Sequence, residues 1–96
     1  MAGVPANGSA AQARLRAALA DALRRRDRVA VSALRSALSA IGDAGRPSLT
    51  AAEVGRIIRA EIGERLGAAD AYDLGGQPGP ARRLRAEADV LRRLDG

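Results

Sequence analysis

Apolar residues recur at steps of three and four in four segments of this chain, and this spacing constrains its fold more than any other feature. Such spacing places the apolar side chains of a segment on one face of an α-helix. No segment shows the alternation that is typical of a strand. The pattern predicts an all-α fold, a small antiparallel four-helix arrangement with a long third helix. The four apolar stripes are Leu15, Ala18, Leu19, Ala22 and Leu23; Val31, Leu34, Ala37, Leu38 and Ile41; Val54, Ile58, Ile62, Ala69 and Tyr72, flanked by Ile57 and Leu66; and Leu84, Ala88, Leu91 and Leu94.

Capping residues predict where the first two helices begin. Ser9 and Gln12 have the spacing of a capping box, so the first helix is expected to start at Ser9. Asp27 is the expected N-cap of the second helix, which should end in the breaker-rich stretch from Gly42 to Pro47.

Similar signals bound the other two helices. Thr50 and Glu53 form a second capping box, which predicts a third helix from about Ala51 to Leu74. The run from Gly75 to Pro80 contains three glycines and two prolines and predicts a turn, with Pro80 as the first residue of the fourth helix.

The length of 96 residues predicts one domain, residues 9–96, preceded by a disordered N-terminal segment, residues 1–8. The N-terminus lacks the apolar run of a signal peptide, and no segment approaches the roughly 20 apolar residues of a membrane span. We therefore expect a cytoplasmic protein without membrane contact. The absence of cysteine and histidine argues against disulfides and against Cys/His metal sites, so no metal and no cofactor are expected.

The residues that usually carry catalysis are also missing. A nucleophile or an acid/base pair commonly uses Cys, His or Lys, and the chain contains none of them. The Gly75-Gly76 pair lacks the Lys and Ser/Thr of a phosphate-binding loop. We expect no catalytic residues and no independent enzymatic activity.

Positive charge is concentrated in the first half of the chain. Residues 1–48 carry eight arginines against three acidic residues, whereas residues 49–96 carry eight of each. On the second helix, Arg28, Ser32, Arg35 and Ser39 share one face. Together with Arg24 and Arg25 they form a candidate nucleic-acid-binding surface, because guanidinium groups and hydroxyls bind phosphate oxygens. The alternative is an ordinary solvated helix face.

A second polar group lies on the predicted third helix. Glu61 and Arg65 are four residues apart at the edge of the apolar stripe, two turns before Tyr72. A partly buried charge needs a partner, so these three residues are expected to form a structural polar network. The alternative is that Arg65 contacts a ligand or a partner.

From about Arg14 to Leu94 the sequence resembles the first helical subdomain of YqeY-like proteins, in the GatB/YqeY family. The resemblance rests on Asp27 followed by Val31-Ser32-Ala33-Leu34-Arg35, on Leu49-Thr50, on Glu61-Ile62, Arg65, Ala71-Tyr72 and Gly76, and on Glu87 and Leu91. Gly63, Gly67 and Gln77 depart from the family pattern, as does the ending Leu94-Asp95-Gly96. The family's second, three-helix subdomain is absent from these residues.

The resemblance implies a non-catalytic module that binds tRNA or associates with tRNA amidotransferase, and it carries the family label of carbon–nitrogen ligase with glutamine as amido-N-donor. The partner would be tRNA or another structured RNA. The alternative is a protein-interaction module or a homo-oligomer, for which Leu66 and Leu94 would be the sensitive positions. A DNA-binding helix-turn-helix around Thr50 to Arg59 is a third alternative, which the acidic residues Glu53, Glu61 and Glu64 disfavour.

Overall fold

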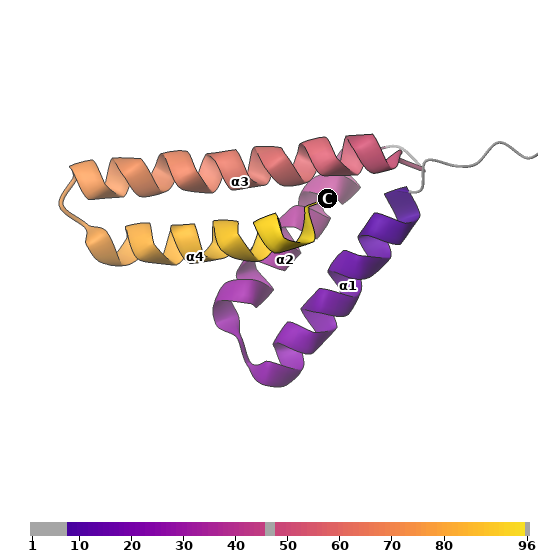
Figure 1. Ribbon diagram of the computed structural model, residues 1–96, viewed down its shortest axis with the longest axis horizontal. Helices are drawn as coiled ribbons and strands as arrows, with labels where there is room; N and C mark the ends of the chain where they lie inside the picture. Colours follow the sequence, from indigo (N-terminus) through magenta and orange to yellow (C-terminus); the bar gives the residue numbers. More distant parts are fainter. Residues whose placement is uncertain (1–7, 46–47, 96) are drawn as a thin grey trace, which may run out of the picture.

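The computed structural model describes residues 8–45 and 48–95, and in these residues the chain forms four α-helices (Figure 1). They are α1 (Gly8–Arg25), α2 (Arg28–Asp43), α3 (Ala51–Leu74) and α4 (Pro78–Leu94). The predicted all-α fold with a long third helix is therefore confirmed. Residues 1–7 of the predicted disordered segment lie outside the described residues, and Gly8, its last residue, is instead the first residue of α1.

The helices form two antiparallel hairpins that cross each other (Figure 1). α3 and α4 lie side by side and make the most extensive contact between any two helices. α2 packs against both of them, and α1 packs on α2 and α3. The outer end of the α3–α4 hairpin extends past the α1–α2 pair, and residues 70–80 are all exposed.

The core is built from a few large aliphatic side chains and many alanines. Leu15, Leu34, Val54 and Leu91 are the largest side chains that are fully buried. Small residues between them allow the helix backbones to approach closely, so the thin core is still continuous. The core cluster consists of Ala11, Leu15, Ala22, Ala30, Ala33, Leu34, Ala37, Ile41, Leu49, Val54, Ile58, Ile62, Ala88 and Leu91.

The start of α1 differs from its prediction. Ser9 lies inside the helix rather than before it, and the side-chain oxygen of Gln12 accepts a hydrogen bond from Arg16 at 3.4 Å. The cause is a tertiary contact, because the Gly8 amide donates to the Leu49 carbonyl at 3.0 Å. A Cβ at position 8 would collide with that carbonyl, so only glycine fits at this start.

The turn between α1 and α2 is a tight helix-ending motif. The Asp27 amide donates to Ala22 O at 2.9 Å and the Arg26 amide to Leu23 O at 3.2 Å, which is the pairing of a Schellman motif. Arg26 occupies its left-handed position with φ of 56°, where glycine is usual. Asp27 then caps α2 as predicted, since its Oδ1 accepts from the Ala30 amide at 3.1 Å.

α3 begins at the predicted capping box. The Glu53 amide donates to Thr50 Oγ1 at 3.1 Å, and the Thr50 amide donates to Glu53 Oε1 at 2.8 Å. The helix then continues without a break to Leu74, as expected. Its apolar stripe is correct for Val54, Ile58, Ile62 and Ala69, which are buried.

The turn before α4 is shorter than predicted. Gly76, with φ of 75°, closes a second Schellman motif in which the Gln77 amide donates to Tyr72 O at 2.8 Å. α4 starts at Pro78 and not at Pro80. Both prolines fit inside the first turn because the first amides of a helix have no intrahelical acceptor, so no hydrogen bond is lost.

Candidate nucleic-acid interface and buried polar network

The six residues of the predicted nucleic-acid surface are all exposed, but the structure gathers only some of them. Arg28, Ser32 and Arg35 line a groove of about 590 Å³ at the corner between α1 and α2. Arg24, Arg25 and Ser39 do not border this groove. The groove is completed by Leu23, Arg26 and Val31. We call this groove, with its six lining residues, the corner groove.

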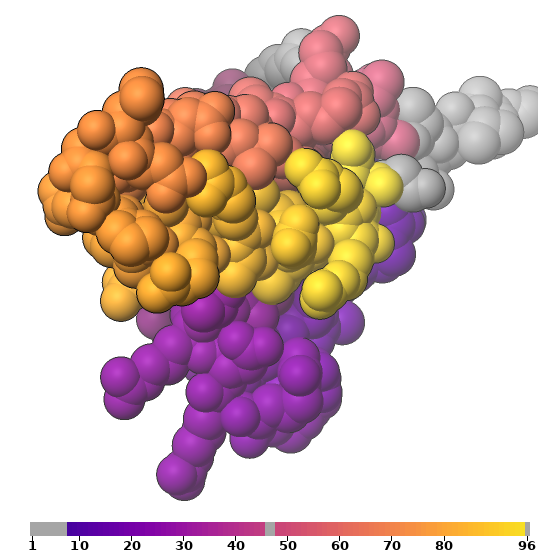
Figure 2. Space-filling model, turned by 60° about the vertical axis from the view of Figure 1, so that its left-hand side comes forward, coloured from indigo at the N-terminus to yellow at the C-terminus, as the bar shows by residue number. Residues whose placement is uncertain are grey.

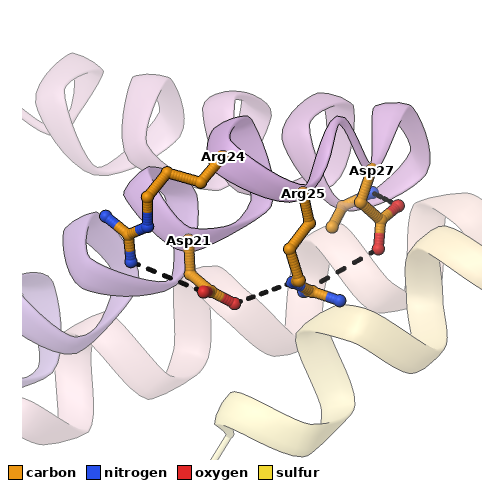
Figure 3. Close-up of polar contacts among 5 residues, drawn as sticks. Asp21, Arg24, Arg25 and Asp27 are labelled. Carbon is orange, nitrogen blue, oxygen red and sulfur yellow. Dashed lines mark hydrogen bonds and ion pairs between the residues drawn. The ribbon is translucent and has the colours of Figure 1, made fainter.

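Two of the predicted arginines are engaged with acidic neighbours (Figure 3). Asp21 accepts from Arg24 at 3.4 Å and from Arg25 at 2.8 Å, and Arg25 also lies 3.9 Å from Asp27. These pairs are exposed, so each contributes little to stability, but the carboxylates offset part of the positive charge. The spacing of Asp21 to Arg24 and Arg25, three and four residues, is the signal that sequence reasoning could have used.

The arginines of the corner groove have no such partners. Among the ion pairs between described residues, none involves Arg26, Arg28 or Arg35. Their guanidinium groups are therefore available to an anion from outside the chain. Arg26 was missing from the predicted set, because its place in the groove depends on the left-handed turn that joins α1 to α2.

The apolar part of the corner groove also differs from expectation. Leu23, predicted to lie on a buried stripe, is 48% exposed because it sits in the last turn of α1 and faces the groove. By contrast, Leu66 and Leu94, the positions expected to be sensitive in a protein-interaction module, are half-buried and pack against the core. The aliphatic side chain exposed at this corner is thus Leu23, and neither Leu66 nor Leu94 is fully exposed.

A buried polar network joins α2, α3 and α4. Arg65 is buried and donates from Nε to Glu87 Oε1 at 2.9 Å and from Nη1 to Glu61 Oε1 at 3.0 Å. Ser36 on α2 donates to the same Glu61 oxygen at 2.7 Å. No buried side-chain nitrogen or oxygen of the described residues lacks a hydrogen-bond partner. The network therefore holds three helices in one register.

The membership of this network differs from the predicted trio. Glu61 and Arg65 are in contact, but Tyr72 is 40% exposed and lies outside the network. Arg65 instead pairs with Glu87, which sequence reasoning used only as a family marker. A signal was present, because Glu87 lies three residues after Leu84 and four before Leu91, on the apolar stripe of α4. A charge in that position requires a buried partner.

Arg85 is committed elsewhere on the α3–α4 hairpin. Its Nη2 lies 2.6 Å from Asp73 Oδ2 and 3.0 Å from Asp70 Oδ1. Hydrogen bonding to Asp73, and then to Asp70, raises the pKa of the Arg85 guanidinium above its ordinary value. The two carboxylates therefore hold this arginine against α3.

Neither a membrane segment nor a metal-binding cluster is found in the described part of the chain. None of its helices is long and apolar enough to cross a bilayer, and no three acidic side chains gather there as metal ligands would. Comparison with family models, curated proteins and solved structures finds no match to this chain.

Proposed function

We propose that the protein is a non-catalytic RNA-binding module that contacts phosphates through the corner groove. The observation that carries the proposal is the grouping of Arg26, Arg28 and Arg35, which have no acidic partner among the described residues, around one hollow with Ser32. Arginine forks match phosphate oxygens, and a serine hydroxyl adds a contact that is independent of base sequence. The resemblance to the GatB/YqeY family favours tRNA as the RNA and an amidotransferase-associated role.

The backbone at Arg26 supports a role for its side chain. A non-glycine residue in the left-handed region costs about 1 kcal/mol or more, and a glycine at this position would relieve that cost. Residues that keep such strained conformations often serve a function. The chain has an arginine there, and its side chain borders the groove.

The test is binding of the purified protein to bulk tRNA and to a length-matched DNA duplex over a salt series. Three phosphate contacts predict a log–log slope of about −3, taking the coefficient for duplex DNA. The variant Arg28→Glu/Arg35→Glu should lose about tenfold or more in affinity.

The matched control is Arg56→Glu/Arg93→Glu, which changes the net charge equally at two exposed arginines away from the corner. This control should bind RNA with a smaller loss. Equal losses in both variants would show that net charge alone drives binding, and the corner groove would not be the interface.

A second candidate function, a protein-interaction module, is favoured by the apolar wall of the groove. Leu23 and Val31 lie beside the three arginines, and such a surface also fits an amphipathic helix with acidic residues. Leu23→Ser should abolish binding of such a partner while leaving the salt-dependent affinity for RNA nearly unchanged. The two functions are separated by this variant.

A further inference from the structure

Tyr72 is the one aromatic residue of the chain, and it is exposed at the uncovered end of the α3–α4 hairpin. It lines a hollow of about 690 Å³, which we call the tyrosine hollow. Leu84, Pro80 and Ala68 supply apolar walls, and Arg83 stands at its edge. The volume lies within the roughly 300–1,000 Å³ that small-ligand sites occupy.

The tyrosine hollow and the corner groove each share wall residues with a third hollow. This third hollow, about 360 Å³, lies between α2 and α4 and is bordered by Arg28, Val29, Ser32, Arg83 and Glu87. It shares Arg28 and Ser32 with the corner groove, and Arg83 and Glu87 with the tyrosine hollow. In Figure 2 the α1–α2 corner (purple), α4 and the outer end of the hairpin (orange) lie on one face.

We call the corner groove, the third hollow and the tyrosine hollow together the path. The charges along this path favour an anionic chain. Arg83 takes part in none of the ion pairs between described residues, so it presents a free cation midway along the path. Glu87 is only 6% exposed and its carboxylate is paired with Arg65 at 2.9 Å. The path thus offers arginines at its near end and centre and an aromatic ring at its far end.

We infer that the path binds a single-stranded stretch of RNA, with phosphates on Arg28 and Arg83 and one unpaired base stacked on Tyr72. This inference rests on the proposed function and extends it to a base contact. Nucleic-acid single strands alternate phosphate and base, and proteins bind them with a basic groove combined with aromatic rings. An apolar hollow with an arginine at its edge matches that alternation.

Intrinsic fluorescence tests the stacking directly, because the chain has no tryptophan and Tyr72 is its sole tyrosine. The protein is titrated with a single-stranded oligouridylate and, separately, with inorganic polyphosphate, a polyanion without bases. Stacking predicts that the oligouridylate quenches Tyr72 emission after correction for absorbance. Polyphosphate should occupy the arginines without comparable quenching.

Two pairs of variants test the same inference through affinity. Tyr72→Ala should weaken oligouridylate binding by about 5-fold or more, whereas Tyr72→Phe keeps the ring and should bind like the wild type. Arg83→Gln should weaken binding, while Arg82→Gln changes the adjacent exposed residue, which borders none of the three hollows, and should not. All three positions are exposed in the fold, and helix content by circular dichroism checks that each of the four variants is folded.

The outcomes separate this inference from the proposed function. RNA binding that depends on Arg28 but shows neither quenching nor an effect of Tyr72→Ala would overturn the base contact and leave the phosphate interface standing. Absence of any RNA binding by the wild type would overturn the proposed function itself, and the inference with it.

Discussion

Replacing Glu87 by alanine should destabilise the protein more than any comparable change of a surface acid. Glu87 accepts the hydrogen bond from Arg65 Nε at 2.9 Å, and both side chains are about nine-tenths buried. Removing the carboxylate leaves a buried guanidinium N–H without an acceptor. Glu61 remains within 3.0 Å of the same guanidinium, so part of the charge stays compensated.

The magnitude follows from these contacts. Breaking a buried ion pair by removing one partner costs about 3–5 kcal/mol, and a hydrogen bond to a charged group is worth about 1.5–3 kcal/mol. Because Glu61 keeps its pairing, we expect a loss of about 2–4 kcal/mol. For a domain of this size each kcal/mol lowers Tm by about 4–8 °C, so the variant should melt roughly 10–30 °C below the wild type.

The assay is thermal and urea unfolding followed by helical circular dichroism. The control is Glu64→Ala, which removes an exposed glutamate from α3 and should change stability by less than about 0.5 kcal/mol. The double variant Arg65→Met/Glu87→Met removes both charges together. The double variant should lose less stability than the sum of the losses of the two single variants, because it leaves no unpaired charge at position 65 or 87.

Two results would refute this reasoning. If Glu87→Ala and Glu64→Ala unfold at the same temperature, the buried pair does not hold α3 against α4. If the double variant loses as much stability as the two single variants lose together, Arg65 and Glu87 are not energetically coupled despite their short distance.

Three other predictions follow from the backbone. Gly63→Ala and Gly67→Ala should each stabilise the protein by about 0.5–1 kcal/mol in urea unfolding, because nothing lies within 4 Å of the added Cβ on an exposed face of α3; a loss of stability would show that these glycines serve another contact. Arg26→Gly should stabilise the protein by about 0.5–1 kcal/mol, because glycine relieves the left-handed strain. The same variant should bind tRNA more weakly, and an unchanged affinity would show that Arg26 is not part of the interface. Gly8→Ala should lower Tm, since its Cβ meets the Leu49 carbonyl, and an unaltered melt would mean that α1 can start one turn later at no cost.

The helices and most of their ends could be predicted because their causes are local. A capping box or an N-cap uses groups at most three residues apart, as at Thr50 with Glu53 and at Asp27. Position 8 was the exception, because the acceptor of its amide is Leu49, far away in the chain. The start of α4 was predicted at Pro80 instead of Pro78 for a different reason. Either proline could begin the helix, because the backbone nitrogens of the first turn need no acceptor.

The candidate site was only partly predictable. Periodicity placed Arg28, Ser32 and Arg35 on one helix face, and the structure keeps them together. The spacing of three and four residues from Asp21 to Arg24 and Arg25 could have indicated their ion pairs, which the apolar periodicity alone does not show. Nor could periodicity bring in Arg83, which comes from another helix 55 positions later than Arg28 and reaches the same face only because α2 packs on α4.

The sequence by itself determined that the chain is helical, where its helices lie and which face of each is apolar, because spacing and caps act within a few residues. Tertiary structure decided which parts of those faces are covered. The α1–α2 pair crosses the α3–α4 hairpin and does not reach its outer end (Figure 1). Tyr72, on the apolar stripe of α3, is therefore exposed, while Arg65, two turns earlier, is buried against Glu87. Burial depends on where the neighbouring helices end, and no local pattern in α3 contains that information.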